Sequence, residues 1–169
     1  LEERLDVARV SVTSVIGGSA DALGFVTNAT TAVNAVAWSL DLQPGDEIVV
    51  TDHVYNACHN AVQRVADRCG AHVVVAELPL PCEDEGQIIA AIASKITDRT
   101  VFGLIDHIAS SSALVLPVGA ICQLFEKRGV PVMIDAAHVP GQLPVDVDEL
   151  GATWWTGNLH KWCCTPKGS

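Results

Sequence analysis

Two residues near the end of the sequence have the types and placement for covalent chemistry. The stretch GNLHKWCCTPKGS sets His160 and Lys161 side by side, directly after the strand-like segment ATWWT. Lys161 is either a surface lysine near the end of the sequence or a reactive amine at a strand-to-loop junction. A lysine amine beside a dry site can lose its proton and attack a carbonyl carbon, which forms a Schiff base.

An acid and a pair of hydroxyl residues could act together with that lysine. Asp135 ends the apolar run VPVMI, where a carboxylate is costly to bury unless a cation such as a protonated heterocyclic nitrogen meets it. Thr30 and Thr31 open a predicted helix directly after a predicted strand, and a helix start suits a phosphate group. The structural alternatives are that Asp135 caps the following segment and that Thr30 is only an N-cap. A phosphate cradle, an acid and a lysine are together what pyridoxal phosphate needs.

The elements that must position these residues alternate along the chain. Apolar, β-branched runs predict strands, and apolar residues at helical spacing predict helices. Predicted strands cover residues 24–28, 47–51, 71–78, 100–107, 130–138 and 148–158, and predicted helices cover residues 30–40, 55–70, 86–96 and 117–129, with a helix-like N-terminus. This alternation predicts an α/β fold with three layers, α/β/α, around a mainly parallel sheet.

Polar residues directly follow five of the predicted strands. Because ligands bind beyond the carboxyl ends of parallel strands, we expect these residues to converge on one rim. They are residues 28–31, 51–53, 106–107, 135–138 and 156–158.

Composition excludes several other classes of site. The formal net charge of −10 argues against a nucleic-acid partner, and no apolar run reaches membrane-spanning length. The six cysteines lack zinc spacing, so no metal site is predicted and reduced cysteines in a cytoplasmic protein are expected. The segment IGGSADALG does not match the dinucleotide fingerprint and there is no Walker pattern, which disfavours NAD and ATP.

Five stretches in order resemble the class V aminotransferase family of fold-type-I pyridoxal-phosphate enzymes. They are FVTNATTAVNAVAWSL, PGDEIVVTDHVYNA, LIDHIASSSALVLPV, MIDAAHVPG and WTGNLHKWCCTPKGS. The similarity is to the isopenicillin N epimerase-like branch, which is related to cysteine desulfurases and C–S lyases.

The resemblance implies a role for each matching residue. Lys161 is implied as the Schiff-base lysine and Asp135 as the partner of the pyridine nitrogen. Thr30 and Thr31 are implied to hold the phosphate of the cofactor, helped by Asn158 and His160. Tyr55 is implied to place its ring over the cofactor, with His53 as the competing candidate. His138 is implied to lie near the phenolic oxygen of the cofactor, and Ser110 stands where desulfurases carry asparagine.

The resemblance also implies an enzyme that acts on an amino acid and forms a homodimer when intact. Residues 1–169 are then a partial cofactor-binding large domain, without the rest of that domain and the C-terminal small domain. Epimerisation at the α-carbon is the leading activity, with a C–S lyase or an aminotransferase as alternatives. Alternatives of other classes are an inactive truncated remnant of the fold and a hydrolase that uses Ser110 and His107.

Overall fold

The five strands within residues 2–167 lie in one parallel sheet. The computed structural model describes residues 2–167, so Leu1, Gly168 and Ser169, which include the end of the last stretch of resemblance, lie outside the described residues. The strand order is β2-β1-β3-β4-β5, and each neighbouring pair is parallel. The strands are β1 (Glu47–Thr51), β2 (His72–Ala76), β3 (Thr100–Asp106), β4 (Val132–Ala136) and β5 (Trp154–Gly157).

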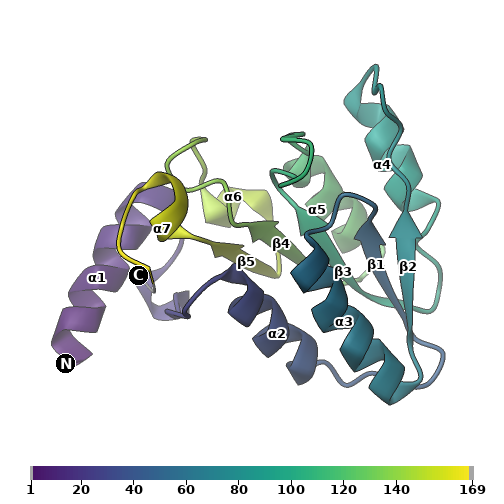
Figure 1. Cartoon of the computed structure of the whole chain (residues 1–169), viewed down its shortest axis with the longest axis horizontal. Coiled ribbons are helices and arrows are strands. Elements are labelled where there is room, and N and C mark those ends of the chain that lie inside the picture. Colours follow the sequence, from purple (N-terminus) through teal and green to yellow (C-terminus); the bar gives the residue numbers. More distant parts are fainter. Residues whose placement is uncertain (1, 168–169) are drawn as a thin grey trace.

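Helices cover both faces of this sheet, which confirms the predicted three-layer α/β/α arrangement. Figure 1 shows α2 and α3 on one face, α4, α5 and α6 on the other, and α1 beyond the β5 edge. The helices are α1 (Glu2–Ile16), α2 (Ala29–Ser39), α3 (Asn56–Cys69), α4 (Glu85–Ala93), α5 (Val118–Lys127), α6 (Val147–Leu150) and α7 (Leu159–Trp162), with a short 3-10 turn at Ala20–Ala22. No helix within residues 2–167 is long and apolar enough to cross a bilayer.

Alternate residues of the central strands belong to two separate hydrophobic cores, one on each face of the sheet. Ile48 and Val50 of β1 pack towards α2 and α3, whereas Val49 between them packs towards α4 and α5. The same alternation holds in β4, where Met133 joins the first core and Ile134 the second. Because successive side chains of a strand point to opposite faces, a continuous apolar run is what a sheet covered on both faces requires.

Local sequence signals explain the end of α3 and the start of α2, although the residue predicted as the N-cap of α2 needs a correction. Gly70 ends α3 in the left-handed conformation, at φ 72°, as predicted for a C-cap glycine. The alternative that Thr30 is the N-cap of α2 is wrong, because Asn28 occupies that position and its side chain accepts from the Thr31 N–H. Thr30 therefore lies inside the first turn of α2.

Three segments differ from the sequence prediction. Residues 148–158 were predicted as one strand, but Val147–Leu150 form helix α6 and β5 covers only Trp154–Gly157. Residues 24–28 were predicted as a strand, but the structure has no strand there, because no described strand pairs with this segment and its side chains Phe25 and Val26 are partly exposed. In addition, Lys161 does not lie in a loop after β5: it lies in the one-turn helix α7, which follows β5 after Asn158.

Gly103 offers a test of how tightly β3 and α5 pack. A Cβ at Gly103 would lie 2.5 Å from the Phe125 ring of α5, so we expect Gly103→Ala to lower the free energy of unfolding by about 1–3 kcal/mol. Gly119→Ala is the matched control, because a Cβ there meets nothing within 4 Å and alanine favours a helix, so stability is expected to stay equal or rise by up to ~1 kcal/mol. Urea unfolding of the intact protein measures both changes, and an equal effect of the two substitutions would contradict this packing.

Candidate functional site

The polar ends of the strands meet in one pocket at the carboxyl edge of the sheet. Of the predicted cofactor-contacting residues, the ones that line it are Thr30, Tyr55, Ser110, Asp135, His138, Asn158 and Lys161. The pocket also includes Ala29, Asp106, Ile108 and Ala137, whereas Thr31, His53 and His160 do not line it. Four of the five polar segments that were expected to converge contribute residues to this pocket, whereas residues 51–53 at the end of β1 do not, and the roles of the individual residues remain predictions.

Asp135 stands at the end of β4 with both carboxylate oxygens acting as acceptors. It is only 3% exposed. Its Oδ1 accepts from the Ala137 N–H at 3.0 Å, and its Oδ2 accepts from the Cys58 thiol at 3.2 Å. The first bond is the local cap that the structural alternative predicted, but the second comes from α3, 77 residues away. Burial, followed by the charge of Asp135, raises the pKa of the Cys58 thiol, so this thiol is a donor to Asp135 and not a thiolate.

Lys161 reaches the same pocket from α7. Its Nζ lies 3.0 Å from Nε2 of His138, and the Trp162 indole N–H donates to Nδ1 of the same ring at 3.2 Å. Burial lowers the pKa of Lys161, against the opposing charges of Asp135, Cys58 and Asp106. Burial and the neighbouring Lys161 also lower the pKa of His138. The pocket thus contains an amine whose neutral form is favoured by its surroundings.

The start of α2 offers fewer free amides than expected. The Ala29 N–H donates to Oδ1 of Asn158 at 2.9 Å, and the Thr31 N–H donates to Oδ1 of Asn28. The Thr31 hydroxyl lies 3.2 Å from that same oxygen, away from the pocket. Within residues 2–167 the Thr30 N–H has no hydrogen-bond partner, so this amide and the helix dipole are what α2 presents to an anion.

The structure separates the two candidates for a ring over the cofactor. Tyr55 lines the pocket and is 47% exposed. His53 is buried outside the pocket, with Nδ1 held 2.9 Å from Oγ of Ser112. His160 is also turned away, and its Nδ1 is buried without a partner among the described residues. Only Tyr55 is placed for stacking over a ligand in this pocket.

Asp106 is a site residue that the sequence argument did not assign. It is 2% exposed and pairs in register with Asp135 on the neighbouring strand. Its Oδ2 has no partner among the described residues. Burial, together with the charge of Asp135, raises the pKa of Asp106 to about 8. The sequence signal was present in its place at a strand end, but nothing in the sequence showed that it lies beside Asp135.

The hydrolase alternative does not match the hydrogen bonding. The buried His107 has no partner at Nδ1 among the described residues, and burial lowers its pKa. The serine that bonds a histidine is Ser112, with His53, and not Ser110 with His107. Those two residues therefore do not form the nucleophile–base pair that such a mechanism needs.

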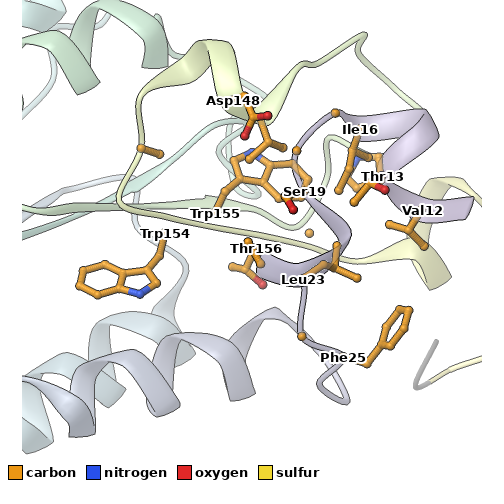
Figure 2. Close-up of a pocket in the computed structure, with 18 of the residues that line it drawn as sticks. Val12, Thr13, Ile16, Ser19, Leu23, Phe25, Asp148, Trp154, Trp155 and Thr156 are labelled. Atoms are coloured by element: carbon orange, nitrogen blue, oxygen red, sulfur yellow. The ribbon is translucent and has the colours of Figure 1, made fainter. Parts of the chain in front are cut away.

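A larger cavity lies beside β5 and lacks comparable chemistry. It has a volume of about 370 Å³ and lies between α1, the extended segment 23–26 and β5. Figure 2 shows Thr13 and Ile16 of α1 near Trp155 of β5, and Asp148 is the only charged residue among the described residues that line the cavity. The pocket with Lys161 encloses only about 30 Å³, less than the roughly 300–1,000 Å³ of typical ligand pockets.

Comparisons with known proteins agree on one family. The family model "Aminotransferase class-V" matches residues 1–169. The isopenicillin N epimerase of Streptomyces clavuligerus is 35% identical over 95% of this chain and 40% of its own length. A putative L-cysteine desulfhydrase of Oryza sativa subsp. japonica is also 35% identical, over 98% of this chain and 38% of its own length.

Solved structures show the same fold. The cystine C–S lyase C-DES, in complex with its reaction product cysteine persulfide, matches with a TM-score of 0.91 at 25% identity over 98% of this chain and 45% of that one. A cysteine desulfurase of Thermococcus onnurineus matches with a TM-score of 0.87 at 24% identity over 98% of this chain and 41% of that one, and this likeness shows the fold alone. The chain spans less than half the length of these relatives.

Asp106 predicts a pH dependence of stability. Its folded-state pKa of about 8 lies above the ordinary value of 3.8, so the protonated form stabilises the fold and stability falls as pH rises from about 4 to about 8. We expect the free energy of unfolding of the intact protein, without added ligand, to fall by up to about 1.4 kcal/mol per pH unit in this range. We expect this component to be absent in Asp106→Asn, and urea unfolding at a series of pH values measures it.

Asp98→Asn, at an exposed aspartate, is the control and is expected to leave the pH profile of the wild type unchanged. A profile of Asp106→Asn that overlays the wild type would show that Asp106 does not carry the buried proton.

Proposed function

The chain belongs to the aminotransferase class-V family, and from this premise we propose that it forms the cofactor-binding part of a pyridoxal-phosphate enzyme acting on an amino acid. The observation that carries the proposal is that one pocket combines Lys161, the Asp135 carboxylate and the first turn of α2. These three features come from segments far apart in the sequence.

The residues of the pocket fit the chemical groups of that cofactor. The buried Asp135 carboxylate has donors but no cation among its hydrogen-bond partners, so a protonated ring nitrogen would complete it. The Thr30 amide at the start of α2 would hold the phosphate. The Lys161 amine would hold the aldehyde, and Tyr55 would cover the ring. When bound, the cofactor withdraws electrons from the α-carbon of an amino acid attached to it.

The protein's own contribution is to hold and move protons at defined atoms. Asp135 supplies a fixed negative charge, and its bonds to Ala137 and Cys58 keep the carboxylate in place. Lys161, once its amine is released, takes the α-proton of the amino acid as a general base, for which a lowered pKa is suited. The buried residues Ala29 and Ile108 line the pocket and limit the access of water there.

The relatives named above differ in the reaction that follows removal of the α-proton. Return of the proton to the opposite face of the α-carbon would give epimerisation, as in the isopenicillin N epimerase. Departure of a sulfur group from the β-carbon would give the chemistry named for the desulfhydrase and the C–S lyase. Transfer of the amino group is the third outcome. We favour α-carbon epimerisation, because Ser110 stands where desulfurases carry asparagine and His138 where they often carry glutamine.

A panel of amino acids separates these outcomes. The intact protein, loaded with pyridoxal phosphate, is incubated with each amino acid while sulfide, keto acid and loss of chirality are followed together. Loss of chirality without sulfide or keto acid is the expected result. Release of sulfide together with a keto acid from cysteine would replace the epimerase proposal by the C–S lyase alternative, because loss of the β-sulfur group and hydrolysis of the remaining fragment give a keto acid.

Three further expectations from the resemblance belong to this proposal. Residues 1–169 would be part of the large domain, the intact enzyme would be a homodimer, and it would work in the cytoplasm, where reduced cysteines are usual. The described structure contains six free cysteines, in agreement with a reducing compartment. An inactive remnant is the alternative of another class, and it predicts no cofactor capture by the intact protein.

Lys161→Ala tests the covalent step. We expect the wild type to absorb visible light with bound cofactor and, after borohydride, to carry the cofactor mass on the peptide containing Lys161. The variant should lose both signals and about 10²–10⁴-fold of its rate, because the general base is removed. Lys127→Ala, at an exposed position of α5, is the matched control. Wild-type turnover by Lys161→Ala would refute the mechanism.

A further inference from the structure

Three polar side chains form a chain of hydrogen bonds at the edge of the pocket. The Trp162 indole bonds Nδ1 of His138 at 3.2 Å, and Nε2 of His138 lies 3.0 Å from Nζ of Lys161. Nothing in the sequence pattern singled out Trp162, which is 53% exposed on α7. The indole N–H finds its hydrogen-bond partner in His138, and this polar contact orients the ring.

The backbone around His138 is shaped to allow this contact. Gly141, at φ 86°, lies so close to α7 that a Cβ there would meet the Trp162 carbonyl group at 2.8 Å. Gly157, which precedes α7, lies similarly close to Pro140, with 2.7 Å to its Cγ. Two glycines therefore let the segment after β4 approach both ends of the β5–α7 connection. This close approach brings the His138 ring between Trp162 and Lys161.

The direction of each hydrogen bond follows from donor chemistry. An indole N–H can only donate, so Nδ1 of His138 must be an acceptor and carries no proton. A neutral imidazole with a bare Nδ1 has its proton on Nε2. That N–H points at Lys161, so the amine must accept with its lone pair. An ammonium group at Lys161 has no lone pair and would face a second donor.

The remaining groups around the amine do not disturb this assignment. Asp135 on β4, Asp106 on β3 and Cys58 on α3 raise the pKa of Lys161, whereas burial, the largest influence, lowers it. The Tyr55 hydroxyl, from the start of α3, belongs to the same pocket. None of these groups donates a hydrogen bond to His138 among the described residues, so Trp162 alone fixes its tautomer.

We propose that Trp162 is a positioning residue that fixes the Nε2–H tautomer of His138 and thereby holds Lys161 as a neutral amine. The inference deepens the proposed function, on which its catalytic meaning rests. In that role Trp162 keeps the lone pair of the Lys161 amine oriented and free to react before a carbonyl group binds. Trp162→Phe keeps an aromatic ring but removes the donor, which frees His138 to carry its proton on Nδ1 and to accept from a lysine ammonium.

The test measures the reactivity of the amine without the cofactor. The cofactor-free intact protein is labelled with dinitrofluorobenzene across a pH series, and modification of Lys161 is quantified by peptide mass spectrometry against Lys127, an exposed lysine of the same digest. We expect Trp162→Phe to lower the Lys161 rate near pH 7.5 by about fivefold, as loss of one hydrogen bond predicts, and to move the midpoint of its profile upward by about 0.7 pH unit.

Matched controls separate a change of tautomer from a change of fold. Trp38→Phe removes an indole from α2, where it stacks with Arg68, and is expected to leave the Lys161 profile unchanged. His138→Leu removes the ring that transmits the effect, so adding Trp162→Phe to it should cause no further shift. The proposed relay is the chain of hydrogen bonds from Trp162 through His138 to Lys161. It would be overturned if the Lys161 labelling profiles of Trp162→Phe and wild type overlay while the circular dichroism is unchanged.

The two proposals fail separately. If Trp162→Phe shows the labelling shift but the wild type captures no pyridoxal phosphate on Lys161, the proposed function is overturned and the role of Trp162 in orienting His138 still stands. A wild type that captures the cofactor while Trp162→Phe labels normally would overturn the relay alone.

Discussion

The whole site depends on five parallel strands ending at the same edge of one sheet. Asp106, Asp135 and Thr156 are neighbours in register across β3, β4 and β5. Since side chains alternate between faces, a slip of one residue in β4 would turn Asp135 away from α3 and put Ile134 in its place. Met133 and Ile134 point to opposite faces of the sheet and join different cores. The same alternation therefore also determines the direction of the Asp135 side chain. Packing energy spread over the strands fixes the position of one carboxylate.

A buried hydrogen bond joins the end of β5 to the start of α2. Oδ1 of Asn158 accepts from the Ala29 N–H at 2.9 Å, across 129 residues of sequence. It links the end of β5, from which Lys161 follows, to the start of α2. The geometry gives Asn158 a structural task distinct from direct contact with a phosphate, because its oxygen already occupies an amide that an anion would otherwise use. This link ties the segment that carries Lys161 to the first turn of α2.

The sequence predicted the elements better than the contacts between them. Continuous apolar strands, amphipathic helices and Gly70 carry their signals locally, and the predicted sheet and layers are present. Residues 24–28 have the composition of a strand, but a strand also needs a partner, which composition does not specify. Asn28 and Thr30 are both good N-caps, and only the backbone decides between them. Cys58, Asp106 and Trp162 act through distant partners, so their meaning appears only when the fold brings those partners together.

The charges of the pocket explain why an amine and two acids can share it. Asp135 accepts hydrogen bonds at both oxygens, as a carboxylate anion does, whereas burial beside it raises the pKa of Asp106 to about 8 and keeps that acid protonated at neutral pH. In the state proposed above, with Lys161 neutral, the pocket would carry one uncompensated negative charge. Such a charge is costly in a dry site, and protonation of Lys161 would relieve it only by giving up the bond from His138. A cationic ring nitrogen beside Asp135 would neutralise the charge and leave the lysine lone pair free. The same electrostatics therefore favour the ligand and preserve the nucleophile.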